Sequence, residues 1–109
     1  MKLVKCIVRE MMAEQTTAAL KTIDVSGLTM THAQGRGRHP TAPMSWRGCE
    51  HEAFLPNVTI DMVVPDDLVD DVIRVVMETA RTGHMGDGRI FVMPVEEAYT
   101  IRTRAGGVD

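Results

Sequence analysis

The residues best suited to chemistry in this sequence lie in one short stretch, RTGHMGDGRIF. Gly83, Gly86 and Gly88 allow backbone conformations that other residues avoid, so consecutive N–H groups can point into one concavity and hold an anion. Arg89 adds a planar guanidinium group that matches phosphate oxygens, and Arg81 adds a second positive charge. The stretch is therefore a candidate phosphate-binding loop. A simple turn is the alternative that the local sequence favours, because Asp-Gly is a strong turn signal.

Two further groups of arginines lie near flexible or terminal segments. Arg36 and Arg38 alternate with Gly35 and Gly37. Arg102 and Arg104 lie in the C-terminal tail. Ligands often bind to loops that a rigid scaffold holds in place. Neither a P-loop pattern nor a complete G-x-G-x-x-G pattern is present, so a nucleotide would be bound in a different way.

Catalytic and metal-binding candidates are fewer. Cys49 and His51 could ligate a metal with His32 and His39, but a solvated loop is favoured because metal sites need three or four ligands in suitable geometry. No side chain has the context of an activated nucleophile or of a base that positions water. We therefore expect a protein without enzymatic activity.

Composition sets broad limits on the function. The chain has 109 residues with 44% hydrophobic and 25% charged residues, which is typical of one globular domain spanning 1–109. A net charge of -3 argues against a nucleic-acid-binding protein. No apolar run reaches the length of a membrane span, so no membrane insertion is expected. Two cysteines make no disulfide framework, and a reduced, cytoplasmic setting is expected, with Cys6 buried.

Hydrophobic periodicity divides the chain into strands and helices. Alternation predicts strands at 2–9, 28–34, 57–64 and 89–94. Helical spacing predicts one helix over 12–23 and a second that begins at 65–67, with an apolar stripe formed by Val69, Val72, Ile73, Val76 and Ala80. The order β-α-β-β-α-β is typical of the ferredoxin-like α+β fold. Two helices would cover one face of a four-stranded antiparallel sheet, and a symmetric partner is expected on the other face.

A long loop separates the second and third predicted strands. Residues 35–56 contain three glycines and three prolines and few periodic apolar residues. Such a loop is uncommon in a small domain and is usually functional. Trp46 in this loop could anchor a protein partner or could pack locally.

The blocks VVPDDLVDDVI and ARTGHMGDGRIFVMPVEEAYTIRT, with GLTMTHAQGRGR and FLPNV, resemble the PII family of nitrogen-regulatory signalling proteins over nearly the whole chain. The resemblance implies a homotrimer that binds ATP or ADP between subunits, with Mg accompanying ATP, and in many members a response to 2-oxoglutarate. By this resemblance, three segments of the chain correspond to the T-loop (about 36–55), the B-loop (about 81–89) and the C-terminal tail (about 98–109) of the family. The T-loop docks onto target proteins in this family.

The resemblance also assigns nucleotide-binding positions. One subunit would contribute Ile7, Gly35, Gly37, Arg38, Val64 and the B-loop residues Gly86, Asp87, Gly88 and Arg89. The family usually has lysine where Arg89 stands. The neighbouring subunit would contribute Gly27, Thr29 and Arg102 to the same cleft.

Several positions depart from the family pattern. His51 replaces a tyrosine that is uridylylated in many members, so that switch is expected to be absent. His39 replaces a glutamine that helps to place magnesium and 2-oxoglutarate, and Asn57 replaces a lysine that meets the oxoglutarate carboxylate. A neutral amide cannot replace an ammonium group there, so we expect altered oxoglutarate sensing or a different anion. Thr100 replaces an arginine, and Arg104 stands where glycine is common.

The ending EEAYTIRT is similar to the nitrogenase-linked branch of the family. We therefore expect a non-catalytic sensor of adenine nucleotides that regulates nitrogenase through its T-loop, with Trp46, Arg47 and His51 in the partner-binding segment. The alternatives are a regulator of an ammonium transporter or of a carbon- or metal-uptake system, a weak ATPase, and a structural or metal-binding trimer.

Overall fold

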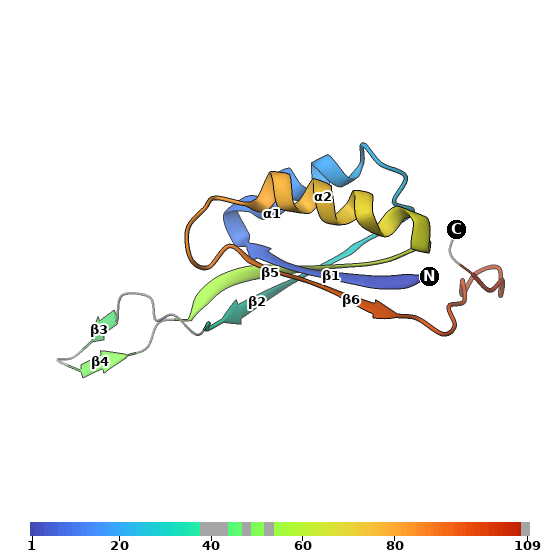
Figure 1. The fold of residues 1–109 in the computed structure, drawn as a ribbon. Helices are drawn as coiled ribbons and strands as arrows, with labels where there is room; N and C mark the ends of the chain where they lie inside the picture. The colour runs from blue at the N-terminus through green and yellow to red at the C-terminus, as the bar shows by residue number, and fades with distance from the viewer. Residues whose placement is uncertain (38–43, 47–48, 52–53, 108–109) are drawn as a thin grey trace.

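The computed structural model describes residues 1–37, 44–46, 49–51 and 54–107. The elements are β1 (Lys2–Arg9), α1 (Glu10–Leu20), β2 (Thr29–Gly35), β3 (Met44–Trp46), β4 (Cys49–His51), β5 (Leu55–Val64), the 3₁₀ helix η1 (Asp66–Leu68), α2 (Val69–Ala80) and β6 (Gly88–Pro94). The four long strands form one sheet in the order β2-β5-β1-β6, with every neighbouring pair antiparallel. Helices α1 and α2 lie side by side on one face of this sheet (Figure 1). This arrangement confirms the predicted ferredoxin-like α+β fold.

The core lies between the sheet and the two helices. Alternation along β1 and β5 points every second side chain toward the helices, and these side chains are buried, as at Val4, Cys6 and Ile60. Fully burying a valine or isoleucine side chain contributes about 1.5–3 kcal/mol. The alternating pattern therefore fixes both the strands and the face on which the helices pack.

Helix α2 supplies the best-defined part of the helical layer. Its buried residues are Val72, Val75, Val76 and Ala80. The predicted stripe is confirmed at Val72, Val76 and Ala80, whereas Val69 and Ile73 are only half-buried and Val75, which was not predicted, is buried. The first turn predicted at 65–67 is the 3₁₀ turn η1, which leads directly into α2.

Element ends differ from the predicted ones by one to three residues. Helix α1 begins at Glu10 instead of residue 12, and it ends at Leu20 in a tightened turn in which the Ile23 N–H donates to the Leu20 carbonyl over 3.3 Å. Strand β5 begins two residues early and includes Pro56. Proline is tolerated there because pairing with β1 starts only at Asn57, so the missing N–H costs no ladder bond on that side. No helix among the described residues is long and apolar enough to cross a bilayer.

The second face of the sheet has no covering element within the described chain. Leu3, Ile7, Val63, Phe91 and Met93 point to this open face, since their register partners alternate with the buried set. Phe91 and Met93 are 41% and 37% exposed. The open face is the one for which the sequence predicts a symmetric partner.

The T-loop contains regular structure that the sequence did not predict. Strands β3 and β4 pair antiparallel, with Met44 opposite His51 and Trp46 opposite Cys49. This hairpin extends away from the sheet (Figure 1). Strands of three residues are too short to give a recognisable alternation, which is why the segment was expected to be irregular.

Candidate functional site

The B-loop joins α2 to β6, and it depends on glycine at position 88, where β6 begins. Gly83, Gly86 and Gly88 all have positive φ, at 88°, 94° and 111°. A Cβ atom at Gly88 would lie 1.7 Å from the carbonyl oxygen of Ile7, inside the β1–β6 pairing. Glycine at position 88 is therefore required for the loop to lead into β6 and for β6 to pair with β1.

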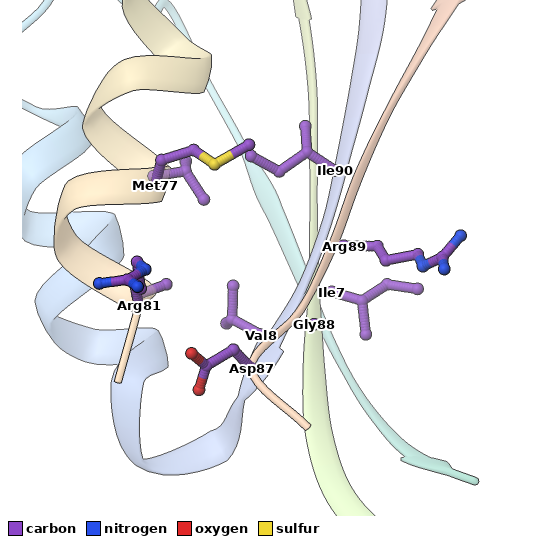
Figure 2. Close-up of a pocket in the computed structure, with 10 residues that line it drawn as sticks. Ile7, Val8, Met77, Arg81, Asp87, Gly88, Arg89 and Ile90 are labelled. Atoms are coloured by element: carbon purple, nitrogen blue, oxygen red, sulfur yellow. The ribbon is translucent and has the colours of Figure 1, made fainter. Parts of the chain in front are cut away.

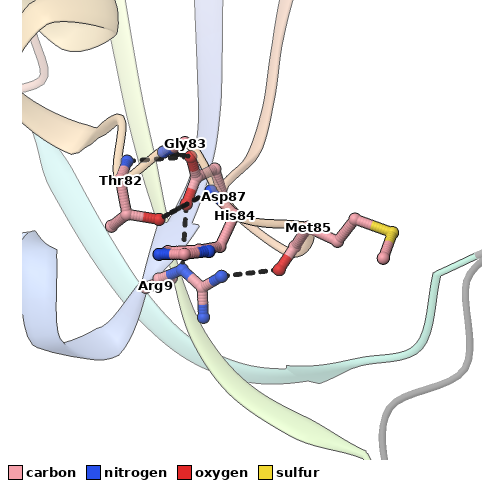
Figure 3. Close-up of polar contacts among 6 residues, drawn as sticks. All are labelled: Arg9, Thr82, Gly83, His84, Met85 and Asp87. Atoms are coloured by element: carbon pink, nitrogen blue, oxygen red, sulfur yellow. Dashed lines mark hydrogen bonds and ion pairs between the residues drawn. The ribbon is translucent and has the colours of Figure 1, made fainter.

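The Asp87 carboxylate lies at the centre of the B-loop (Figure 3). Its Oδ2 accepts hydrogen bonds from the N–H groups of Thr82 and Gly83, at 2.8 Å and 2.9 Å. Its Oδ1 accepts from the Thr82 hydroxyl and, over 3.0 Å, from Nε of Arg9. The Thr82 hydroxyl first, and then Arg9 and the two amides, hold the pKa of Asp87 well below its usual range. The carboxylate thus stays charged and is neutralised inside the loop.

This network changes the predicted anion site. The N–H of Gly83 was expected to face an external anion, but it binds the loop's own Asp87 carboxylate. Among the described residues, none accepts a hydrogen bond from the N–H of Met85 or Gly86. The amides that could receive a phosphate oxygen are therefore those in the middle of the loop, rather than those at its start.

The two arginines of the B-loop do not converge. Arg89 is the register partner of Ile7, so its side chain points to the open face. Figure 2 shows Arg81 and Met77 on the helix side of β6 and Arg89 on the opposite side. Within a single chain, strand β6 therefore separates the side chains of Arg81 and Arg89.

A hollow of about 240 Å³ lies on the helix side, between the end of α2 and the beginning of β6 (Figure 2). Its lining is mainly apolar and includes Met77, Ala80 and Ile90, and its charged members are Arg81, Asp87 and Arg89. Asp87 is already bound to Arg9 and Thr82, and the Arg89 side chain points to the open face, so Arg81 is the charge that this hollow would offer to a ligand.

The base of the T-loop lies at the same end of the sheet as the B-loop. Gly35 ends β2 opposite Leu55, the first residue of β5. A Cβ atom at Gly35 would lie 2.5 Å from Nδ2 of Asn57, so the Asn57 amide packs directly on this glycine. A Cβ atom at Gly86 would lie 3.7 Å from the Leu55 side chain. The two loops therefore meet at one edge of the domain.

The other predicted nucleotide-binding residues lie elsewhere. Gly27 precedes β2, and Thr29 begins it, on the sheet edge opposite β6 and about 14 Å away across three strand spacings. Val64 is 1% exposed in the core, so only its backbone could meet a ligand. Arg102 belongs to the tail, a segment that leaves the end of β6 away from the B-loop (Figure 1). A single chain does not bring these residues to the B-loop.

Some predicted residues cannot be placed. Arg38, His39 and Arg47 lie outside the described residues, and for Trp46 and His51 only the backbone is described, in β3 and β4. Gly37 is described and exposed, and a Cβ atom there would meet nothing within 4 Å.

The metal-binding alternative gains no support from the part of the chain that is described. His32 lies exposed on β2, and no group of three potential ligands occurs among the described side chains. Cys6 is buried as predicted, and burial, with the nearby Asp61 carboxylate, raises the pKa of its thiol to about 11. Such a thiol is a core residue with little nucleophilic or metal-binding capacity at neutral pH.

Sequence reasoning missed two residues of this site, Arg9 and Thr82. The Arg9 guanidinium binds Asp87 and, through Nη2, the Met85 carbonyl over 2.6 Å. The available signal for Thr82 was Asp87 in a glycine-rich turn, because aspartate side chains often bond to neighbouring backbone groups in turns. Nothing local indicated Arg9.

Comparison with known proteins identifies relatives over the whole domain. A family model described as nitrogen regulatory protein P-II matches residues 1–105. The chain is 41% identical to P-II of Haemophilus influenzae over 104 residues, covering 94% of this chain and 93% of that protein. It is 39% identical to P-II of Bradyrhizobium diazoefficiens over 110 positions, with 100% and 98% covered. It is 41% identical to nitrogen regulatory protein GlnK of Escherichia coli, with 94% and 93% covered. The chain therefore belongs to the P-II family of nitrogen regulatory proteins.

Proposed function

We propose that this protein is a non-catalytic sensor that binds ATP or ADP at the B-loop and controls a protein target through its T-loop. The observation that carries the proposal is the B-loop itself. Its middle amides, at Met85 and Gly86, have no partner among the described residues, and Arg89 follows directly on the open face. Backbone amides and a guanidinium group together are well suited to polyphosphate.

The binding cleft forms between subunits of a homotrimer. The open face carries apolar side chains, such as Phe91 and Met93, that one chain leaves partly exposed. Gly27 and Thr29, which are assigned to the neighbouring subunit, lie at the sheet edge opposite β6, and the tail that carries Arg102 lies at the other end of β6 from the B-loop. Association of three copies through the open face accounts for both features.

The target is assigned to nitrogen metabolism. Membership of the P-II family supports this class, and the EEAYTIRT ending supports nitrogenase over an ammonium transporter. The effector is an adenine nucleotide, with Mg accompanying ATP. Asn57 offers a neutral amide at the T-loop base, so 2-oxoglutarate binds weakly or is replaced by another anion.

Calorimetric titration tests nucleotide binding. Wild-type protein is expected to bind ATP and ADP with micromolar Kd. Arg89→Ala removes the guanidinium group and should weaken the affinity for each nucleotide by at least about tenfold, or 1.4 kcal/mol. Arg74→Ala is the matched control, because Arg74 forms exposed ion pairs on α2 away from the loop. If the wild-type protein binds neither nucleotide, the sensor function is wrong.

Three further measurements complete the test. Analytical ultracentrifugation should give three times the 12.0 kDa mass of the chain. Steady phosphate release above about 1 per second, the low end of ordinary enzyme rates, would favour the alternative of an ATPase. Pull-down from cell extract with ATP or ADP, with and without 2-oxoglutarate, should recover a nitrogen-metabolism protein whose binding depends on the ligand.

A further inference from the structure

Arg9 forms an ion pair that is shielded from much of the solvent. Its side chain is 24% exposed, and the Asp87 side chain is 23% exposed. The guanidinium donates from Nε to Asp87 Oδ1 over 3.0 Å and from Nη2 to the Met85 carbonyl over 2.6 Å (Figure 3). Partial burial and two directed hydrogen bonds make this pair stronger than an ordinary surface ion pair.

The pair fixes the B-loop at three points. Asp87 binds the amides of Thr82 and Gly83 at the start of the loop, and Asp87 itself lies at the end. Arg9 binds the carbonyl of Met85 in the middle. A loop held in this way loses less conformational freedom when its remaining amides bind a ligand.

Arg9 also reaches the base of the T-loop. It is the register partner of Asn57 at the end of the β1–β5 ladder. A Cβ atom at Gly86 would lie 3.4 Å from Nη2 of Arg9 and 3.7 Å from Cδ1 of Leu55, where β5 begins. The middle of the B-loop, the Arg9 side chain and the returning end of the T-loop therefore pack against one another.

We propose that Arg9 and Asp87 are positioning residues that hold the B-loop in its polyphosphate-binding shape and link that shape to the T-loop base at Leu55. The inference rests on the proposed nucleotide-binding function. Arg9 acts through Asp87 and the Met85 carbonyl, and it needs no contact with the nucleotide. A conformational change in the B-loop is transmitted to the T-loop base, and the reverse, because both segments pack against the Arg9 side chain.

Four variants test the pair: Asp87→Asn, Arg9→Gln, Arg9→Lys and the double variant Arg9→Gln/Asp87→Asn. We expect ADP and ATP affinity to fall about tenfold in Asp87→Asn and about fivefold in Arg9→Gln, with Arg9→Lys closer to the wild type. The double variant should lose no more than the worse single one, because both singles break the same interaction. Affinity for adenosine, measured by competition with ADP, should change less than twofold.

Two outcomes of the titrations would overturn the proposal. Multiplied losses in the double variant, about fiftyfold, would mean that Arg9 and Asp87 act independently. Equal losses for adenosine and ADP would mean a general loss of structure. Arg74→Gln serves as the control, because it removes an arginine with comparable ion pairs at an exposed site, and it should leave every affinity unchanged.

Hydrogen exchange and amide NMR on the nucleotide-free protein separate this proposal from the proposed function. Asp87→Asn should speed exchange of the Thr82 and Gly83 amides, and Arg9→Gln should shift the Leu55 amide signal. If wild-type protein binds no nucleotide, the proposed function fails while these readouts still decide the pair. Unchanged exchange at Thr82 and Gly83, or an unmoved Leu55 signal in Arg9→Gln, overturns the positioning role.

Discussion

The two turns that flank β6 meet the same backbone requirement in different ways. The B-loop, which precedes the strand, has left-handed backbone at Gly83, Gly86 and Gly88. The hairpin in the tail, which follows the strand, has left-handed backbone at Arg104, with φ of 59°, and at Gly107. Glycine adopts this conformation without steric cost, whereas a residue with a side chain loses about 1–2 kcal/mol. The B-loop is therefore relaxed where the tail is strained.

The two turns also differ in what holds them. The B-loop is closed by side chains, with Asp87 bound to Thr82 and Arg9. The tail hairpin is closed by backbone bonds, including the Thr100 N–H to the Ala105 carbonyl at 2.8 Å and a bridge between Tyr99 and Gly106. Side-chain closure makes the B-loop depend on particular residue types, and backbone closure makes the tail tolerant of them. Backbone closure therefore accommodates Arg104, which carries a side chain and has a positive φ.

The largest expected effect comes from Gly88→Ala. The new Cβ would lie 1.7 Å from the Ile7 carbonyl oxygen, so β1 and β6 would have to separate. We expect a loss of more than about 3 kcal/mol in the free energy of unfolding, measured by urea denaturation. Gly27→Ala is the control, because a Cβ there meets nothing within 4 Å, and it should stay within about 0.5 kcal/mol. If Gly88→Ala and Gly27→Ala were equally stable, the conclusion that the B-loop depends on glycine at position 88 would be wrong.

A smaller effect is expected from the charge of Asp87. Its pKa in the folded protein is below the value of about 4 in an unfolded chain, so the folded state binds fewer protons there. The stabilisation is complete above about pH 4 and is lost as the pH falls toward the folded pKa. Asp87→Asn replaces the carboxylate with an amide that does not titrate, so the variant lacks this pH-dependent stabilisation. The stability difference between wild type and Asp87→Asn should therefore be largest near pH 7 and should shrink below pH ~4 in denaturation series.

The acidic-pH comparison has an internal control. The pKa of Asp66 is also lowered, first by its hydrogen bond to the N-terminal ammonium group, which lies 2.8 Å away. This group titrates equally in wild type and in Asp87→Asn, so its contribution cancels in the difference. A difference that stays constant from pH 7 to below pH 4 would show that the Asp87 charge does not stabilise the loop.

The smallest effect is expected from Arg104→Gly, and it has the opposite sign. Glycine relieves the left-handed strain of about 1–2 kcal/mol but adds freedom to the unfolded chain. We expect a net gain of about 0.5–1 kcal/mol, seen as a higher Tm in calorimetry. A loss of stability would mean that the Arg104 side chain makes interactions that outweigh the strain.

Local patterns predicted most of the fold and part of the site. Alternation at Val4, Cys6 and Val8 predicted β1, and helical spacing at Val72 and Val76 predicted α2. Both patterns are visible in sequence because burial on one face repeats with the period of the element. The same reasoning missed β3 and β4, since three residues do not complete a pattern.

The site needed more than local patterns. Glycines at 83, 86 and 88 identified the candidate loop, because glycine is the residue that most readily adopts left-handed backbone. The pattern gave no direction for the Gly83 amide, which binds Asp87 instead of an external anion. It also grouped Arg81 with Arg89, although strand β6 places them on opposite sides.

The sequence by itself determined the two helices and the four long strands, their order, most of the buried faces and the position of the long loop, since each follows from neighbouring residues. Only the tertiary structure decided that Arg9 meets Asp87, 78 positions along the chain. That contact exists because β1 and β6 pair in a register that sets Val8 opposite Gly88. Register is a property of two strands together, and neither strand carries it alone.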